Sequence, residues 1–457
     1  MDPIHKFRVG IYRDFVAKAK RLNEYNGLFW ETYAMLEKTD SWGISQFREY
    51  QLQKIISLIQ FAYKNTKYYR SMFDEHGWKP ENFQNFHDLK KIPILTKDIL
   101  KNNLNELRAI PLHKCVAVTT GGSTGIPTKI FLDARNTEAI RLAFVWRSFH
   151  EGGYYFGDKI AILRGKVIGS ENILTDHKNN ILYCSSMNMS EKNMRKYLYQ
   201  IQKFGTRHIR AYPSSAELLA KYIKDTGTTF NENGKIKTLF TSSETLTSDV
   251  RELIEEQLHV KVVDLYGNSE QIGMIGQCRG GHYHEYMCHS YLEYLDDDNK
   301  SVKTGEGRII GTGFINQAMP LIRYDTGDVA LLGKNYLEGC VNRQRVISSI
   351  AGRHRKDEFL IGREENLVNF VAINTHVDIF DRIYRYQFVQ EKKGHVRINV
   401  MPGRGYTDAD NRNIYREFKK RLGETFDIEV CETNQFEYTL RGKSKLLVQK
   451  LISESKY

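Results

Sequence analysis

The chain contains few cysteines, little proline and no long hydrophobic run. Its 457 residues include six cysteines and eight prolines. The cysteines are scattered and form no C-x-x-C pair, so a disulfide framework is not expected, and their use is typical of a reducing, cytoplasmic compartment. No run of eighteen apolar residues occurs and the N-terminus has no apolar signal core, so neither a transmembrane segment nor a secretory signal is expected.

Acidic residues are also in the minority, with 55 Asp and Glu against 67 Lys and Arg, which gives a net charge of +12. A basic surplus can attract nucleic acid, a membrane surface or anionic small molecules. The basic residues are interspersed with acids, however, and no homeodomain, zinc-finger or RNP pattern occurs. We therefore expect a solvated surface and no nucleic-acid partner, and keep a nucleic-acid or membrane-surface binder as the weakest alternative.

Strand-like and helix-like segments alternate through the middle of the chain, after a largely helical region over residues 1–110 in which Thr96 caps a helix. This alternation predicts an α/β fold, with a large multi-layer N-terminal domain over residues 1–352 and mostly parallel sheets. The expected strands cover residues 159–164, 206–212, 238–241 and 260–266, and the expected helices cover residues 192–204, 216–224 and 248–258.

From about Gly280 the sequence pattern changes to shorter β-like runs. After Gly352 and Arg353 a new pattern of strands and a helix begins. Two strands, at residues 395–400 and 426–431, flank a helix at residues 408–422. We therefore predict that residues 353–457 form a separate small α/β C-terminal domain, whose length of roughly 100 residues is common for a domain.

The stretch VTTGGSTGIPTK, from Val118 to Lys129, combines glycines, hydroxyl residues and a terminal lysine. Glycines allow positive φ and a close approach to a ligand, so the stretch is typical of an anion nest and favours a polyphosphate. It lacks the Walker and dinucleotide spacings, and a plain surface loop is the alternative. The candidate phosphate-binding residues are Thr119, Thr120, Gly121, Gly122, Ser123, Thr124, Gly125 and Lys129.

Further polar segments follow along the chain. In YGNSEQIG, Tyr266 can stack on a planar base and Glu270 can hold Mg²⁺ against phosphates. In RYDTGD, Asp328 can accept two ribose hydroxyls, while Arg353 and Lys443 add positive charges further on. Taken singly, each residue is better explained as part of a turn, a satisfied surface carboxylate or a surface ion pair. Ligands in α/β folds nevertheless collect at the carboxyl ends of strands.

Taken in order, these segments resemble the AMP-forming adenylating superfamily, which includes acyl-CoA synthetases, peptide-synthetase adenylation domains and luciferases. TTGGSTGIPTK resembles its phosphate loop, YGNSE its Y-G-x-x-E motif and RYDTGD its ribose-binding T-G-D motif. AGR resembles the hinge-proximal G-R, and RGKSK the C-terminal G-K.

Four other segments are similar to phenylacetate–coenzyme A ligases and their CapK-like relatives, a branch often linked to capsular polysaccharide biosynthesis. They are Tyr68–Arg70, Asp88–Lys97, Tyr212–Glu217 and Ser242–Thr247. The resemblance therefore covers nearly the whole chain.

The resemblance implies ATP-dependent activation of a carboxylic acid, in which the carboxylate attacks the α-phosphate and pyrophosphate leaves. It implies that Lys443 bridges the carboxylate and the α-phosphate, that Glu270 binds Mg²⁺, and that the glycine-rich stretch grips the β- and γ-phosphates. Asp328, helped by Arg353, would bind the ribose. The C-terminal domain would turn after adenylation and remove Lys443. The implied nucleotide-binding set is completed by Ser242, Ser243, Glu244, Tyr266, Gly267, Asn268 and Ser269.

The sequence leaves several points open. After Arg353 it reads HRKDE, where the family more often has paired acids, so the hinge can be Arg355, Lys356 or Asp357. The acid is not identified, and the acyl acceptor can be coenzyme A, a carrier-protein phosphopantetheine, an amine or a sugar hydroxyl. A monomer and a homodimer are both possible. The second hypothesis is a catalytically idle nucleotide-binding protein of a biosynthetic cluster, although Lys443, Glu270 and Asp328 favour an enzyme.

Cys278, His284 and Cys340 can also supply zinc ligands, as in some relatives. Structural zinc takes four ligands, often closely spaced in sequence. No C-x-x-C occurs here, and free cysteine is among the most frequently buried residue types. The sequence therefore favours packed cysteines over a zinc site.

Overall fold

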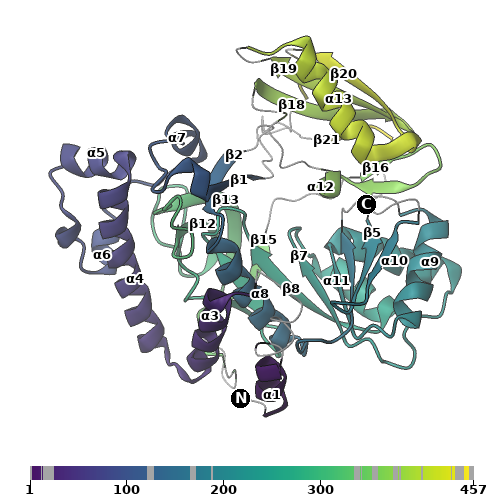
Figure 1. The fold of residues 1–457 in the computed structure, drawn as a ribbon, viewed down its shortest axis with the longest axis horizontal. Helices are drawn as coiled ribbons and strands as arrows, with labels where there is room; N and C mark the ends of the chain where they lie inside the picture. Colours follow the sequence, from purple (N-terminus) through teal and green to yellow (C-terminus); the bar gives the residue numbers. More distant parts are fainter. Residues whose placement is uncertain are drawn as a thin grey trace. The chain divides into compact units, whose positions relative to one another are not determined.

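The computed structural model describes residues 3–11, 13, 25–120, 128–164, 171–186, 189–333, 340, 342–351, 359–373, 379, 382–402, 405–433, 435–437 and 447–451 (Figure 1). The chain divides into two compact units. The first is Met1–Val118, Lys129–Gly157 and Val263–Arg353; the second is Thr119–Thr128, Asp158–Val262 and His354–Tyr457. The boundary after Arg353 lies one residue from the predicted start of the C-terminal domain. The treatment of residues 1–352 as one domain stays a prediction.

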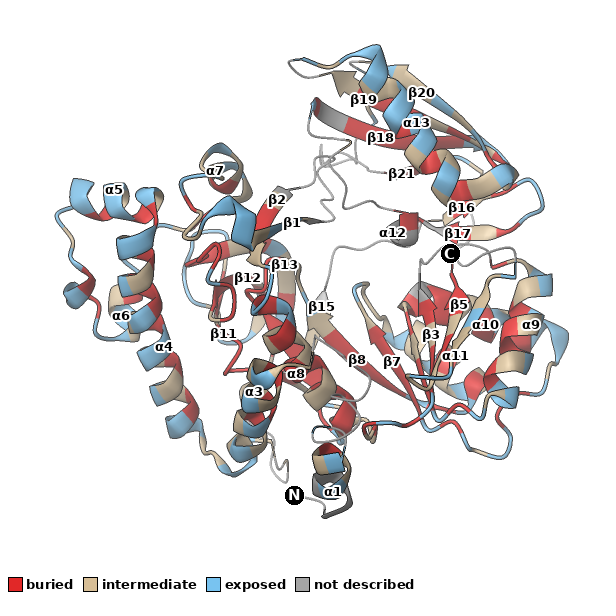
Figure 2. Cartoon of the chain, in the orientation of Figure 1, coloured by how far each residue is buried: buried red, intermediate tan, exposed pale blue. Residues whose placement is uncertain are grey.

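Helices make up the first part of the first unit, as predicted. The buried residues of α4 repeat at helical spacing along one side (Figure 2). The Thr66 and Thr96 side chains accept hydrogen bonds from Tyr69 N and Ile99 N, and so begin α5 and α7. The helices are α1 (Pro3–Ile11), α3 (Gly27–Lys38), α4 (Ile44–Asn65), α5 (Lys67–Glu75), α6 (Phe86–Leu89), α7 (Lys97–Asn102) and α8 (Thr137–Glu151).

The sheets of the first unit are antiparallel. The strand order in one is β11-β12-β13-β15, and β8, β9, β10 and β14 follow one another in a second ladder. These strands are β8 (Lys261–Gly267, which begins in the second unit), β9 (Met274–Gln277), β10 (Tyr283–Glu285), β11 (Ser290–Leu295), β12 (Gly305–Gly313), β13 (Tyr324–Leu332), β14 (Val346–Ile347) and β15 (Ser349–Ala351). The glycine-rich stretch connects two further paired strands, β1 (Cys115–Thr120) and β2 (Thr128–Asp133).

In the second unit, four strands form the predicted parallel ladder in the order β7-β6-β3-β5, and β4 is added antiparallel at the edge. The helices beside these strands bury their apolar faces against them (Figure 1). The elements are β3 (Ile160–Arg164), β4 (Ile173–Asp176), β5 (Ile181–Ser185), α9 (Glu191–Lys203), β6 (His208–Ala211), α10 (Pro213–Thr226), β7 (Thr238–Ser242) and α11 (Ser248–Leu258). The β4–β5 hairpin was not predicted.

The end of the chain contains a four-stranded sheet in the order β20-β19-β18-β21, covered by one face of α13. The predicted strands and helix correspond to β19, β20 and α13, whereas β18 was not predicted. The elements are β16 (Phe359–Ile361), β17 (Leu367–Asn369), α12 (Phe370–Ile373), β18 (Ile383–Lys392), β19 (His395–Pro402), α13 (Asp408–Leu422), β20 (Asp427–Glu432) and β21 (Leu447–Gln449). The predicted α/β class is confirmed.

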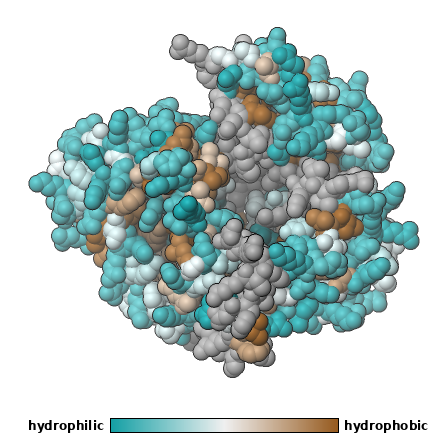
Figure 3. All heavy atoms as spheres, viewed as in Figure 1, coloured by the Kyte–Doolittle hydropathy of each residue, from teal (hydrophilic) through white to brown (hydrophobic). Residues whose placement is uncertain are grey.

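The surface is mainly hydrophilic where it can be seen. On the face drawn in Figure 3, apolar residues form small patches among hydrophilic ones. None of the described helices combines the length and the apolar character needed to cross a membrane.

Arg323 forms a buried ion pair with Glu293 and also connects the sheets of the first unit to its N-terminal helical region. Arg323 donates to both carboxylate oxygens of Glu293, over 2.9 and 3.1 Å, and the two side chains are only 7% and 6% exposed. Its remaining terminal nitrogen donates to the carbonyls of Lys90 and Ile92, over 2.9 and 2.6 Å. Arg323 therefore anchors the start of β13, the strand that carries Asp328.

We predict that Arg323→Met lowers the free energy of unfolding of the first unit by about 3–5 kcal/mol, because it leaves the Glu293 charge buried without this partner. All four tryptophans belong to this unit, so urea denaturation followed by tryptophan fluorescence reports on it.

The matched control is Lys300→Ala, which breaks an ion pair whose side chains are 75% and 76% exposed. We expect this change to cost less than about 1 kcal/mol. Equal shifts in the two variants would contradict a structural role for the buried pair.

Candidate active site

The predicted site residues fall into three groups. The first lies outside the described residues and comprises Gly121, Gly122, Ser123, Thr124, Gly125, Arg353, Lys443 and the possible hinge residues Arg355, Lys356 and Asp357. The second lies at the two ends of the glycine-rich stretch or at the end of β7, and comprises Thr119, Thr120, Lys129, Ser242, Ser243 and Glu244. The third belongs to the first unit and comprises Tyr266, Gly267, Asn268, Ser269, Glu270 and Asp328.

The turn between β8 and β9 holds Glu270 in a buried position. The Asn268 side-chain oxygen accepts from Ile272 N over 3.0 Å, and Asn268 O accepts from Gln271 N over 3.2 Å. Gln271 adopts a φ of +60°, which side chains other than glycine rarely take. Glu270 is only 6% exposed. The turn thus directs a carboxylate inward instead of leaving it at the surface.

Two glycines of β12 let this turn lie directly on the sheet. A Cβ atom at Gly311 would come within 2.4 Å of Ile272 O, and one at Gly313 within 2.5 Å of Gln271 O. Any side chain at these positions would therefore displace the turn. Since β12 is hydrogen-bonded to β13, the glycines set the distance between the YGNSE turn and the RYDTGD segment.

The T-G-D turn is held by its own side chains. The Thr326 hydroxyl accepts from Asp328 N and donates to Ile309 O, both over 2.9 Å. The Asp325 carboxylate accepts from Gly327 N over 2.8 Å and also pairs with Arg308. Gly327 has a φ of +73°. Asp325 and Thr326 therefore shape the turn that presents Asp328.

Side-chain hydrogen bonds connect the two segments. The Tyr266 hydroxyl donates to Asp328 Oδ2 over 2.9 Å, and the Tyr324 hydroxyl donates to Glu270 Oε1 over 3.4 Å. Burial, followed by the negative charge of Asp328, raises the pKa of Tyr266 well above its ordinary value. The structure thus brings together Tyr266, Glu270 and Asp328, three residues that the sequence predicts to contact nucleotide or Mg²⁺.

Sequence reasoning did not single out Tyr324, although it lies inside the quoted RYDTGD segment. No spacing or composition signal distinguishes a tyrosine that bonds a site carboxylate from one that only fills a core. Its contact with Glu270 joins residues 54 positions apart and becomes visible only in the folded chain.

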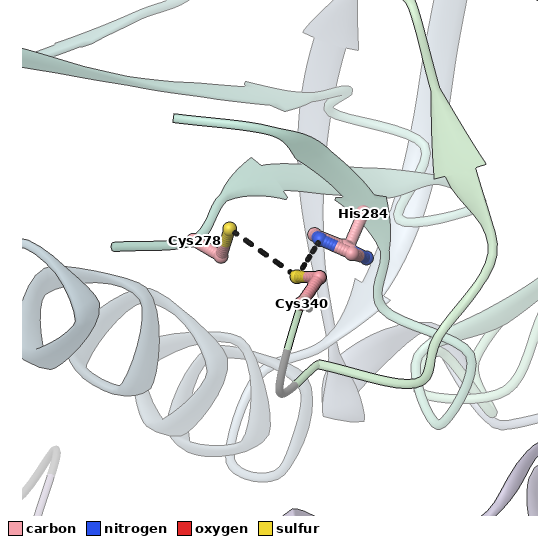
Figure 4. Close-up of side chains that lie close together, drawn as sticks. All are labelled: Cys278, His284 and Cys340. Carbon is pink, nitrogen blue, oxygen red and sulfur yellow. Dashed lines mark hydrogen bonds between the residues drawn. The ribbon is translucent and has the colours of Figure 1, made fainter. Parts of the chain in front are cut away.

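Cys278, His284 and Cys340 converge in the first unit (Figure 4). Their ligand atoms all lie within 4.8 Å of one another. Cys278 Sγ is 3.9 Å from Cys340 Sγ, which is 3.4 Å from His284 Nε2. Tetrahedral zinc with bonds of ~2.3 Å to sulfur and ~2.0 Å to nitrogen gives ligand separations of about 3.8 and 3.5 Å. The measured separations match this geometry.

The environment of the cluster also suits a metal ligand set. His284 Nδ1 lies 3.0 Å from Gln344 O, and a carbonyl only accepts, so this nitrogen carries the proton and Nε2 faces Cys340. Burial opposes ionisation of the Cys278 thiol. The hydrogen bond with His284 and two backbone amides nevertheless lower its pKa to about 7. Three ligands are found among the described residues, one fewer than a closed structural site requires.

Comparison with known proteins gives relatives that match along most of the chain. A phenylacetate–coenzyme A ligase of Aromatoleum evansii is 25% identical, with 91% of this chain and 97% of the relative covered. The CapK protein of Staphylococcus aureus is 22% identical, with 96% and 93% covered. A phenylacetate–coenzyme A ligase of Pseudomonas putida is 28% identical, with 73% and 76% covered.

The C-terminal part and the fold agree with these matches. Residues 360–450 match the family model of the CapK C-terminal domain. A crystal structure of 2-hydroxyisobutyryl-CoA ligase in the postadenylation state aligns with a TM-score of 0.57 at 18% identity, with 89% of this chain and 90% of that chain covered. The same ligase in complex with 2-HIB-AMP and CoA aligns with a TM-score of 0.56. These findings indicate an AMP-forming acid ligase that is similar to phenylacetate–coenzyme A ligases and to CapK.

Proposed function

We propose that this ligase condenses a carboxylic acid with ATP to form an acyl-adenylate and pyrophosphate, and then transfers the acyl group to a thiol, with coenzyme A as the first candidate. The observation that carries the proposal is that, within one unit, the Tyr266 hydroxyl bonds Asp328 while the hydroxyl of Tyr324, on the strand of Asp328, bonds Glu270. A base-stacking ring and two carboxylates for metal and ribose are the groups that a Mg²⁺–nucleotide complex requires.

Charge neutralisation is the central problem of the first step, because two anions must meet. The α-phosphorus–oxygen bond to the carboxylate forms as the bond to pyrophosphate breaks, and negative charge moves onto the leaving oxygens. Glu270 would bind Mg²⁺, which lowers the repulsion at the phosphates. Lys443 would lie between the carboxylate and the α-phosphate, and donors from the Thr119–Lys129 stretch would hold the leaving group. Arg353 would assist Asp328 at the ribose.

The relatives bear on which group accepts the acyl chain. Four matches are to phenylacetate–coenzyme A ligases, and a structural neighbour is in complex with CoA. The sequence resemblance to CapK-like proteins, with which the CapK matches agree, implies a role in capsular or surface polysaccharide biosynthesis, in which a sugar hydroxyl or an amine would take the acyl group. A carrier-protein phosphopantetheine is the remaining thiol.

Pyrophosphate release measured against a panel of carboxylic acids tests the proposed function directly. We expect release that depends on one class of acid, and AMP together with an acyl thioester when coenzyme A is added. Acid-dependent pyrophosphate release without thioester formation would indicate that the acyl acceptor is a carrier thiol, an amine or a sugar. Nucleotide binding with no acid-dependent release would instead support the catalytically idle alternative.

We predict that Lys443→Ala lowers acid-dependent ATP–pyrophosphate exchange by ~100- to 1000-fold, because a charge that acts mainly on the developing transition state is lost. The control is Lys450→Ala, since this lysine pairs with Glu391 and Glu437 on the surface of the same C-terminal part. Near-normal exchange in Lys443→Ala, or an equal loss in both variants, would contradict the assignment.

We also propose that Cys278, His284 and Cys340 bind a zinc ion. The sequence favoured packed cysteines, but packing alone does not require Cys340 Sγ to lie at tetrahedral ligand separations from both Cys278 Sγ and His284 Nε2. A water molecule or one further group would complete the coordination, and the ion would stabilise the β9–β10 region without taking part in acyl transfer.

Protein purified without chelators should contain about one zinc ion per chain, and Cys278→Ser should lose it. Cys115→Ser, which changes a half-buried cysteine outside the cluster, should retain it. Because the metal binds thiolates, protons compete with it, and zinc affinity should fall as the pH is lowered. Elemental analysis and a zinc-competition assay measure both effects. Protein that neither contains nor takes up zinc would restore the packed-cysteine interpretation.

A further inference from the structure

Each nucleotide-contacting segment contains a tyrosine followed, four positions later, by a carboxylate. In β8 and the turn after it these are Tyr266 and Glu270, and in β13 they are Tyr324 and Asp328. The hydrogen bonds run between the segments, because Tyr266 donates to Asp328 and Tyr324 donates to Glu270. Each tyrosine therefore holds the carboxylate of the other segment.

The two phenols differ in the length of their hydrogen bonds and in their burial, since Tyr266 and Asp328 are half-buried. Tyr324 is fully buried and Glu270 nearly so. A hydrogen bond to an ionised acceptor is stronger than a neutral one, and shielding from water strengthens it further. The Tyr266 bond is 2.9 Å long and the Tyr324 bond 3.4 Å, so we expect the first to contribute more.

We propose that Tyr266 and Tyr324 are positioning residues, whose hydroxyls hold Asp328 and Glu270 where they bind the ribose hydroxyls and Mg²⁺. This inference rests on the proposed function, which assigns these roles to the two carboxylates. The Tyr266 hydroxyl thus acts on Asp328 separately from its ring, which would stack on adenine. Because the bonds cross between the segments, movement of either segment disturbs both carboxylates.

A merely structural role is the competing explanation, and the chain offers a matched control for it. Tyr294 donates to Glu285 over 2.9 Å, and both side chains are buried in the same unit. This third tyrosine–carboxylate pair contains no predicted site residue. Tyr294→Phe therefore measures what the loss of such a bond costs in stability alone.

Tyr266→Phe keeps the ring and removes the bond to Asp328. In full-length protein, calorimetric titration with Mg²⁺–ATP and with Mg²⁺–2′,3′-dideoxyATP should show about 10-fold weaker binding of ATP. Binding of the dideoxy nucleotide should be unchanged, because that ligand has no hydroxyl for Asp328 to accept. The preference of the wild type for ATP should therefore nearly disappear.

Tyr324→Phe should instead raise the Mg²⁺ concentration needed for half-maximal ATP binding by about 5-fold, with the ribose preference largely kept. Tyr294→Phe should change neither quantity, although it lowers the thermal midpoint.

Two results would overturn the inference. One is a wild type that does not distinguish the two nucleotides. The other is a pair of tyrosine variants that weaken both nucleotides equally, as a general structural defect would. These binding experiments need no turnover, so a failure of acid-dependent pyrophosphate release would count against the proposed function and not against this inference.

Discussion

The backbone of residues 271–272 lies directly against Gly311 and Gly313 of β12, and this contact constrains the rest of the described site. At Gly311 and Gly313 a Cβ atom would lie 2.4 and 2.5 Å from backbone oxygens, which is closer than real contacts allow. The turn can therefore rest on the sheet only because these positions have no side chain. The burial of Glu270 and the reach of Tyr266 to Asp328 both depend on this separation, since β12 is also the neighbour of β13.

Much of the fold could be predicted from local sequence signals. The strands β3, β6 and β7 and the helices α9, α10 and α11 alternate, and each helix contains apolar residues at helical spacing. The Thr96 hydroxyl caps α7 as expected, because capping depends on residues three positions apart. These signals are short-range, so the sequence alone contains them.

The remaining features depend on contacts between distant residues. The β4–β5 hairpin combines weak apolar runs with Asn180 at a φ of +57°, and nothing in its composition separates it from a loop. Cys278 and Cys340 are 62 residues apart, and their convergence follows from how β10 pairs with β9 and β14. The motifs predicted that Tyr266, Glu270 and Asp328 share a site, but not which tyrosine bonds which carboxylate.

Arginine and tyrosine donors act differently on the carboxylates of these two segments. Glu293 and Asp325 pair with the guanidinium groups of Arg323 and Arg308, which offset their charge and use their oxygens to hold the fold. Asp328 and Glu270 each accept a hydrogen bond from a neutral phenol. A phenol orients a carboxylate without cancelling its charge, and that charge is what a magnesium ion and ribose hydroxyls require. Within one six-residue segment, Asp325 therefore shapes the turn, while a phenol of the other segment orients Asp328.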